Sequence, residues 1–188
     1  MTTRNSLSQL FRHPPHWQDH DFGAQQRLAA SLQSWLNETG SLTQRLRGVY
    51  GAGFGVSLLR QRWQHAFIDE TRLLNQRHDR YQLVREVILH NRQRPLILAR
   101  TIIPASTLRI AERQLHHLGN RPLGEVIFAY PDLSISKRQF SQAQAEIWQP
   151  SLLQQTARIE SLWGRRSVYQ IHQHPLLVAE FFLPDCLT

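Results

Sequence analysis

Apolar residues recur at helical spacing near the start of the chain. The segment Ala24–Leu36 has apolar positions three or four residues apart, which predicts one amphipathic helix. Its apolar face comprises Leu28, Leu32, Trp35 and Leu36. A second, short helix is expected directly afterwards, because Ser41 and Gln44 stand at the spacing of a capping box and Leu42 and Leu46 would then share one face.

Alternating apolar residues predict strands further along the chain. A residue pattern with a period of two, rich in β-branched and aromatic side chains, is typical of a strand with one buried face. Five segments have this pattern or form a short apolar run: Phe54–Trp63, Tyr81–His90, Leu96–Ile103, Ser167–His172 and Leu176–Leu183. We expect the second and third to form one antiparallel hairpin, and the fourth and fifth to form another.

The remaining segments are interpreted as helices and loops. The polar stretch Asp69–Asp79 is expected to be a loop. A helix capped by Ser106 or Thr107 is expected to end near Gly119, and Pro122 is expected to begin another short helix. Residues 134–160 are interpreted as one strand combined with a helix or a surface loop. These elements predict an α+β fold built on a mainly antiparallel sheet.

Composition favours one folded unit in a reducing compartment. A chain of 188 residues with 41% hydrophobic content can bury a sizeable core, and no repeat or linker interrupts it. We expect one domain over residues 1–188, with loose order in residues 1–23. Cys186 is the single cysteine, which excludes an internal disulfide and fits the cytoplasm. The longest apolar run, Leu176–Leu183, is too short to span a bilayer, so no membrane insertion is expected.

The net charge of +8 raises the question of nucleic-acid binding. The arginines are spread along the whole chain instead of forming a block, Lys137 is the single lysine, and no nucleic-acid-binding motif is present. We therefore expect no nucleic-acid partner, whereas a small anion is compatible with many arginines. His172 and His174 could share a strand face as metal ligands, but no third ligand is evident, so no metal site is expected.

Two arginines occupy unusual places in the first predicted hairpin. Arg85 shares its strand face with leucines and valine, and Arg100 shares its face with leucines and isoleucine. If the turn pairs His90 with Pro95, Arg85 lies directly opposite Arg100. Two facing cations in a core would need an anion beside them. Alternatively, a shift of one residue separates them, or either arginine reaches solvent or pairs with an acid such as Glu86.

A single carboxylate interrupts the last predicted strand. Glu180 shares its face with Leu176, Val178 and Phe182. An acid in these surroundings is a candidate general acid, general base or acceptor for a substrate hydroxyl. The alternative interpretation is a structural salt bridge to one of the arginines.

Four stretches of the sequence resemble the chorismate lyase family in order and spacing. They are RYQLVREVIL (Arg80–Leu89), LARTIIPASTL (Leu98–Leu108), LGNRPLGEVIF (Leu118–Phe128) and LWGRRSVYQIHQHPLLVAEFFLP (Leu162–Pro184). The resemblance implies a single α+β domain, an antiparallel sheet, and helical flaps that close over a buried ligand. It also implies an enzyme without a cofactor, and we expect a monomer.

The resemblance assigns roles to five residues. It implies that Arg85 binds the ring carboxylate of chorismate, that Arg100 lies near the pyruvyl group, and that the essential glutamate is Glu180. Backbone amides at Leu123 and Leu42 are implied to hold the same carboxylate. The implied reaction splits chorismate into 4-hydroxybenzoate and pyruvate, which supplies the ring of ubiquinone.

Two departures from the family pattern keep a second function open. Family members usually have glycine where this chain has Ala99, and the segment 129–162 is longer than usual. The alternative function is a non-catalytic module that binds a small anion, like the ligand-binding domains of some transcription regulators.

Overall fold

A six-stranded antiparallel sheet forms the centre of the computed structural model, which describes residues 7–19, 28–111, 115, 118–155 and 160–186. The strands are β1 (Phe54–Gln64), β2 (Gln82–Asn91), β3 (Arg94–Ile103), β4 (Ser134–Gln144), β5 (Ser161–Ile171) and β6 (His174–Phe182). Their order in the sheet is β1-β2-β3-β6-β5-β4, and every neighbouring pair is antiparallel. The predicted α+β fold is confirmed.

Both predicted hairpins are present, and they meet at the middle of the sheet through β3 and β6. The second hairpin turns through His172 and Gln173, whose φ angles of 47° and 64° match the right-handed twist of the flanking strands. Its first strand begins at Ser161, six residues earlier than the pattern predicts. This extension brings the Arg165–Arg166 pair into the sheet.

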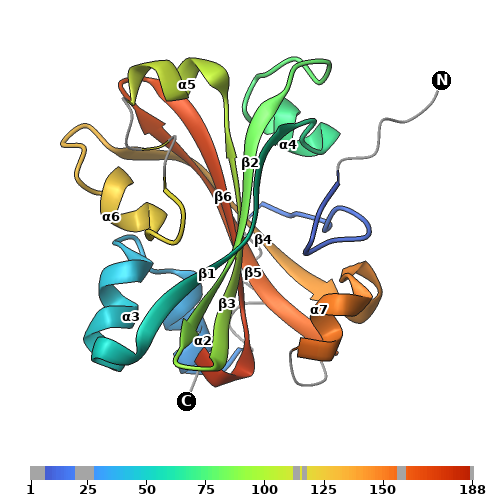
Figure 1. The fold of residues 1–188 in the computed structure, drawn as a ribbon, viewed down its shortest axis with the longest axis vertical. Coiled ribbons are helices and arrows are strands. Elements are labelled where there is room, and N and C mark those ends of the chain that lie inside the picture. The colour runs from blue at the N-terminus through green and yellow to red at the C-terminus, as the bar shows by residue number, and fades with distance from the viewer. Residues whose placement is uncertain (1–6, 20–27, 112–114, 116–117, 156–159, 187–188) are drawn as a thin grey trace.

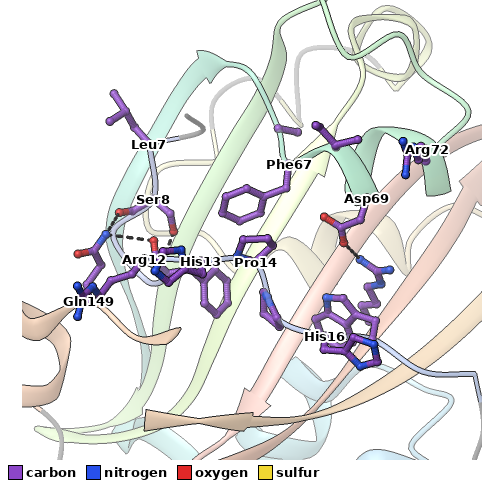
Figure 2. A pocket seen from close by; sticks show the side chains of 16 residues that line it. Leu7, Ser8, Arg12, His13, Pro14, His16, Phe67, Asp69, Arg72 and Gln149 are labelled. Atoms are coloured by element: carbon purple, nitrogen blue, oxygen red, sulfur yellow. Dashed lines mark hydrogen bonds and ion pairs between the residues drawn. The ribbon is translucent and has the colours of Figure 1, made fainter. Parts of the chain in front are cut away.

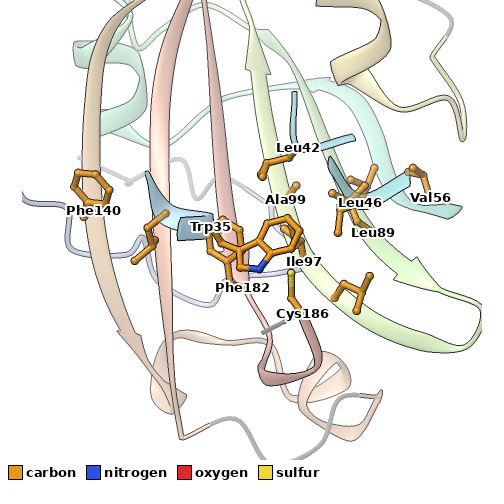
Figure 3. Packing of buried hydrophobic residues seen from close by; sticks show 13 residues of the cluster. Trp35, Leu42, Leu46, Val56, Leu89, Ile97, Ala99, Phe140, Phe182 and Cys186 are labelled. Carbon is orange, nitrogen blue, oxygen red and sulfur yellow. The ribbon is translucent and has the colours of Figure 1, made fainter. Parts of the chain in front are cut away.

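Helices cover the first face of the sheet (Figure 1). They are α2 (Ala30–Leu36), α3 (Leu42–Tyr50), α5 (Ala105–Ile110) and α6 (Leu123–Ile127). The predicted cap of α3 is confirmed, because Oγ of Ser41 accepts a hydrogen bond from the amide of Gln44 at 3.3 Å. Figure 3 shows how Trp35 and Leu46 of these helices pack with Ala99 and Phe182 of the sheet. Part of the predicted helices, residues 24–27 and most of 112–117, lies outside the described residues.

The second face is covered by residues 7–19, α4 (Ile68–Leu73) and α7 (Pro150–Gln155) (Figure 1). Loose order was expected for the N-terminal segment, but Leu10 and Phe11 are buried in the core of this face. The described part of the segment 134–160 contains β4, α7 and a short 3-10 helix, so the predicted combination of a strand with a helix is confirmed. The described residues also include the 3-10 helices η1 (Gly51–Gly53), η2 (Ala145–Ile147) and η3 (Pro184–Cys186).

Helix α4 lies where a loop was predicted. Its sequence is mostly polar, so the apolar pattern gave no helical signal. The carboxylate of Glu70 accepts a hydrogen bond from the amide of Phe67 at 2.8 Å, which caps the first turn. None of the described helices is long and apolar enough to cross a membrane.

Candidate functional site

A β-bulge changes the predicted register of the first hairpin. His90 pairs with Pro95 as expected, but the next residue, Leu89, pairs with Ile97 because the partner strand carries one extra residue there. Since a slip of one residue moves a side chain to the other face, Arg85 lies opposite Thr101 instead of Arg100. The prediction that the two arginines face each other is wrong.

Arg100 lies on the second face, in a buried ion cluster. Its guanidinium donates from Nε to Glu70 and from Nη1 to Glu86, each at 2.7 Å, and the ring of Phe67 lies 4.5 Å away. Burial alone would lower the pKa of Arg100, but the two carboxylates outweigh burial and raise it. Glu86 also accepts a hydrogen bond from Ser8, which ties the N-terminal segment to the sheet. Arg100 therefore pairs with two buried acids and does not face the cavity of the first face.

An open pocket of about 920 Å³ lies above this cluster, between residues 7–17 and α4 (Figure 2). Asp69 of α4 pairs with Nη1 of Arg166 at 2.5 Å, and the guanidinium of Arg166 stacks 4.8 Å from the ring centre of Trp17. Ser8 and Phe67 line the pocket and touch the Glu86–Arg100 cluster beneath it. This pocket is on the opposite side of the sheet from Arg85 and Glu180.

A second, enclosed cavity of about 40 Å³ lies on the first face, beneath α3 and α6. Four of the five predicted site residues line it: Arg85, Glu180, Leu42 and Leu123. The other lining residues are Thr43, Val87, Leu89, Ala99, Thr101, Pro122, Gly124, Ile127, Phe128, Tyr169 and Val178. The fold thus brings the cation, the acid and both helix starts together, without Arg100.

Arg85 is a buried cation that lacks a carboxylate partner among the described residues. Arg85 is only 2% exposed to solvent. Its Nη2 atom donates hydrogen bonds to the carbonyls of Gly119 and Arg121, each at 3.0 Å. Its Nε atom is buried without an acceptor. Burial lowers the pKa of Arg85 to about 10, so the group stays charged at neutral pH. A buried, uncompensated guanidinium is a binding group for an anion.

Glu180 is held by Arg165, a residue that the sequence interpretation missed. The two lie opposite each other in the β5–β6 register, and Nε of Arg165 donates to Oε2 of Glu180 at 2.8 Å. Nη1 of Arg165 donates to the carbonyls of Trp35, Leu36 and Glu38, at the end of α2. The sequence did contain a signal for Arg165, namely two adjacent arginines between Trp163 and the apolar residues of a strand. That signal indicates a buried arginine only once β5 is known to begin at Ser161.

Leu42 and Leu123 are the first residues of α3 and α6. Amides in the first turn of a helix have no acceptor within that helix, which makes both helix starts candidate binding groups for an anion. The two helix starts are in close contact, because a Cβ atom at Gly124 would lie 2.6 Å from Oγ1 of Thr43. The first residues of α3 and α6 therefore line the same cavity as Arg85.

The histidines considered as metal ligands have other contacts. Nδ1 of His172 lies 2.9 Å from Asp132, and Nδ1 of His174 lies 2.7 Å from the carbonyl of His172. In the described part of the chain, no three residues of the metal-binding types come together.

The fold and the cavity define a single-sheet α+β protein in which one cavity is lined by both a buried arginine and an acid. The chain belongs to the chorismate lyase family, whose model matches residues 15–188. It is 47% identical to the probable chorismate pyruvate-lyase of Methylococcus capsulatus over 157 residues, which are 84% of this chain and 97% of that protein. It is 34% identical to the probable chorismate pyruvate-lyase of Thiobacillus denitrificans, over 92% of this chain and 90% of that protein. The predicted family resemblance is confirmed.

Solved structures with a similar fold include PhnF from Mycobacterium smegmatis. The TM-score is 0.61 at 14% identity, covering 81% of this chain and 67% of that chain. Its effector domain alone gives a TM-score of 0.56 at 18% identity, covering 80% and 93%. Similarity at this level of identity concerns the fold alone.

Proposed function

We propose that this chain is a cytoplasmic chorismate lyase that converts chorismate into 4-hydroxybenzoate and pyruvate. The observation that carries the proposal is that one enclosed cavity is lined by both Arg85 and Glu180. Family membership adds the substrate class, since relatives over nearly their whole length bear the name chorismate pyruvate-lyase. The product would supply the ring of ubiquinone.

The ring carboxylate of chorismate would bind to Arg85. This guanidinium has an unfilled donor at Nε, and the first residues of α3 and α6 line the same cavity. A carboxylate there would satisfy the buried charge and the amides of these helix starts together. Leu42 and Leu123 would contribute these amides.

Glu180 would accept a hydrogen bond from the 4-hydroxyl group at the other end of the ring. Arg165 holds one carboxylate oxygen, Oε2, and so orients the second oxygen toward the ligand. In the reaction the C3–O ether bond breaks, the C4 hydrogen leaves as a proton, and the released enolpyruvate gains a proton to become pyruvate. The ring becomes aromatic, so the residues mainly orient the substrate and stabilise developing charge.

Binding would require the flaps α3 and α6 to move apart. The enclosed cavity of about 40 Å³ is far smaller than the roughly 300 Å³ of an ordinary small-molecule site. Both flaps reach the cavity through their first residues, so separating them would open it next to Arg85. Of the two family departures, Ala99 lines the cavity opposite Glu180 in the β3–β6 register, whereas α7 of the longer segment lies on the second face.

The test of this proposal is an assay of purified protein with chorismate and no added cofactor. Formation of 4-hydroxybenzoate is followed by its absorbance, and pyruvate is measured in a coupled reaction with lactate dehydrogenase. Equal amounts of the two products support the lyase. A protein that binds 4-hydroxybenzoate but forms neither product would instead be the anion-binding module.

A further inference from the structure

The first face of the sheet carries a second pair of arginines beside Glu180. In the strand registers, one row of neighbours runs from Arg85 through Thr101, Val178 and Ser167 to Arg138. The adjacent row runs from Val87 through Ala99, Glu180 and Arg165 to Phe140. Paired residues of a sheet share a face, so Arg138 and Arg165 stand on the cavity side, diagonal to each other.

Each of these arginines has a buried donor without an acceptor. Nη2 of Arg165 and Nη2 of Arg138 have no hydrogen-bond partner, although the side chain of Arg165 is only 1% exposed. Nε of Arg138 donates to Oγ of Ser167 at 3.0 Å, and no acid among the described residues forms an ion pair with it. Two guanidinium groups thus lie near one carboxylate, that of Glu180, which pairs only with Arg165, and this leaves an excess positive charge.

The electrostatics of Arg138 agree with this excess. Burial and repulsion by Arg165 lower its pKa, and Tyr169 and Glu180 act in the opposite direction. Tyr169 lines the cavity and acts on Arg138, so the electrostatic surroundings of Arg138 include the cavity wall. Burial and the charge of Glu180 raise the pKa of the Tyr169 phenol, which therefore stays neutral and gives Arg138 no negative partner.

The chemistry of the substrate requires a second cation at this end of the cavity. This step depends on the proposed function, in which Arg85 binds the ring carboxylate and Glu180 meets the 4-hydroxyl. The enolpyruvyl ether is attached to the neighbouring ring carbon, so its carboxylate must lie close to Glu180. Arg100 cannot serve, because it lies on the other face with two acids of its own. We propose that the free Nη2 atoms of Arg138 and Arg165 bind the enolpyruvyl carboxylate.

The test compares two ligands that differ in this carboxylate. One is 4-hydroxybenzoate, which has only the ring carboxylate; the other is 3-(carboxymethoxy)-4-hydroxybenzoate, which has both. Arg138→Gln should weaken the dicarboxylate about tenfold or more, which is the usual loss for a charge-assisted hydrogen bond, and leave 4-hydroxybenzoate within about twofold. Arg138→Lys should restore part of the loss, because it keeps the charge without the planar donor pair.

The control is Arg62→Gln, which makes the same charge change on the exposed edge strand β1. Its affinity for both ligands should equal that of the wild type. The proposal is overturned if Arg138→Gln weakens both ligands equally, which would indicate a structural role, or weakens neither. Failure of the lyase itself is distinguishable, since a wild-type protein without turnover still reports the two affinities.

Discussion

Arg165 and Glu180 form an ion pair across strands β5 and β6, with 2.8 Å between Nε and Oε2. Because the same guanidinium binds three carbonyls at the end of α2, one residue connects the acid of the cavity to the helices that cover it. The acid is therefore held in a fixed position before any ligand arrives.

Glu180→Gln should lower kcat about a hundredfold and change the affinity for 4-hydroxybenzoate by less than about threefold. Glutamine keeps an oxygen that can accept from Arg165, but it loses the negative charge that the reaction uses. Steady-state kinetics and a ligand titration measure the two effects. Glu146→Gln, on an exposed residue, is the matched control. An unchanged kcat in Glu180→Gln would show that the acid has no part in turnover.

Arg100→Met and Arg85→Met should have different effects on the free energy of unfolding, because Arg100 pairs with two buried acids and Arg85 pairs with none among the described residues. Loss of Arg100 leaves Glu70 and Glu86 buried without their cation, which costs about 3–5 kcal/mol of stability. Loss of Arg85 removes a buried cation that lacks an ion-pair partner, so the stability should change by less than about 1 kcal/mol or increase. Urea unfolding measures both free energies. Equal destabilisation by the two substitutions would contradict the assignment of the charges to different environments.

Gly124→Ala should weaken product binding by disturbing the contact between the flaps. The new Cβ atom would lie 2.6 Å from Oγ1 of Thr43 and 3.0 Å from Oγ of Ser41, and overpacking of this kind costs about 1–3 kcal/mol. Isothermal titration with 4-hydroxybenzoate measures the loss. Gly48→Ala is the control in α3, because its Cβ would meet nothing within 4 Å. The flap contact would be irrelevant to binding if both variants bound the product like the wild type.

The thiol of Cys186 should make the protein less stable in alkaline solution. Burial raises the pKa of this thiol from 9.0 to about 12, so the folded state keeps a proton that the unfolded state releases between these values. The free energy of unfolding should therefore fall as the pH rises from about 9 to about 12. The measurement is the difference between the wild type and Cys186→Ala at each pH. A constant difference would show that the thiol does not titrate differently in the two states.

The sequence predicted the sheet well because its strands are rich in apolar residues, and the central strands are buried on both faces. Leu83 and Val87 of β2, for example, alternate with residues of the other face over the whole strand. The register could not be predicted, since a single extra residue at Leu96 moves Arg100 to the other side. Helix α4 was missed because its sequence is mostly polar, and the ion pair that stabilises its buried Glu70 comes from Arg100, thirty residues away.

Four of the five candidate site residues line the cavity, and two of them, Leu42 and Leu123, were assigned only from the family resemblance. Arg85 and Glu180 interrupt apolar strand patterns, which makes them visible without a structure. Arg165 was missed because it precedes the part of β5 that the sequence pattern predicts. Arg138 was missed because it lies in β4, where polar residues are common. Their importance depends on which strands are neighbours, and that information is not local.

The most direct test of the account is the rate of 4-hydroxybenzoate formation from chorismate by the wild type and by Arg85→Gln, measured side by side. The account predicts that the wild type releases one pyruvate for each 4-hydroxybenzoate. It also predicts that the folded variant is at least about a hundredfold slower at low chorismate concentration. A wild type that forms neither product, or a variant as fast as the wild type, would contradict it.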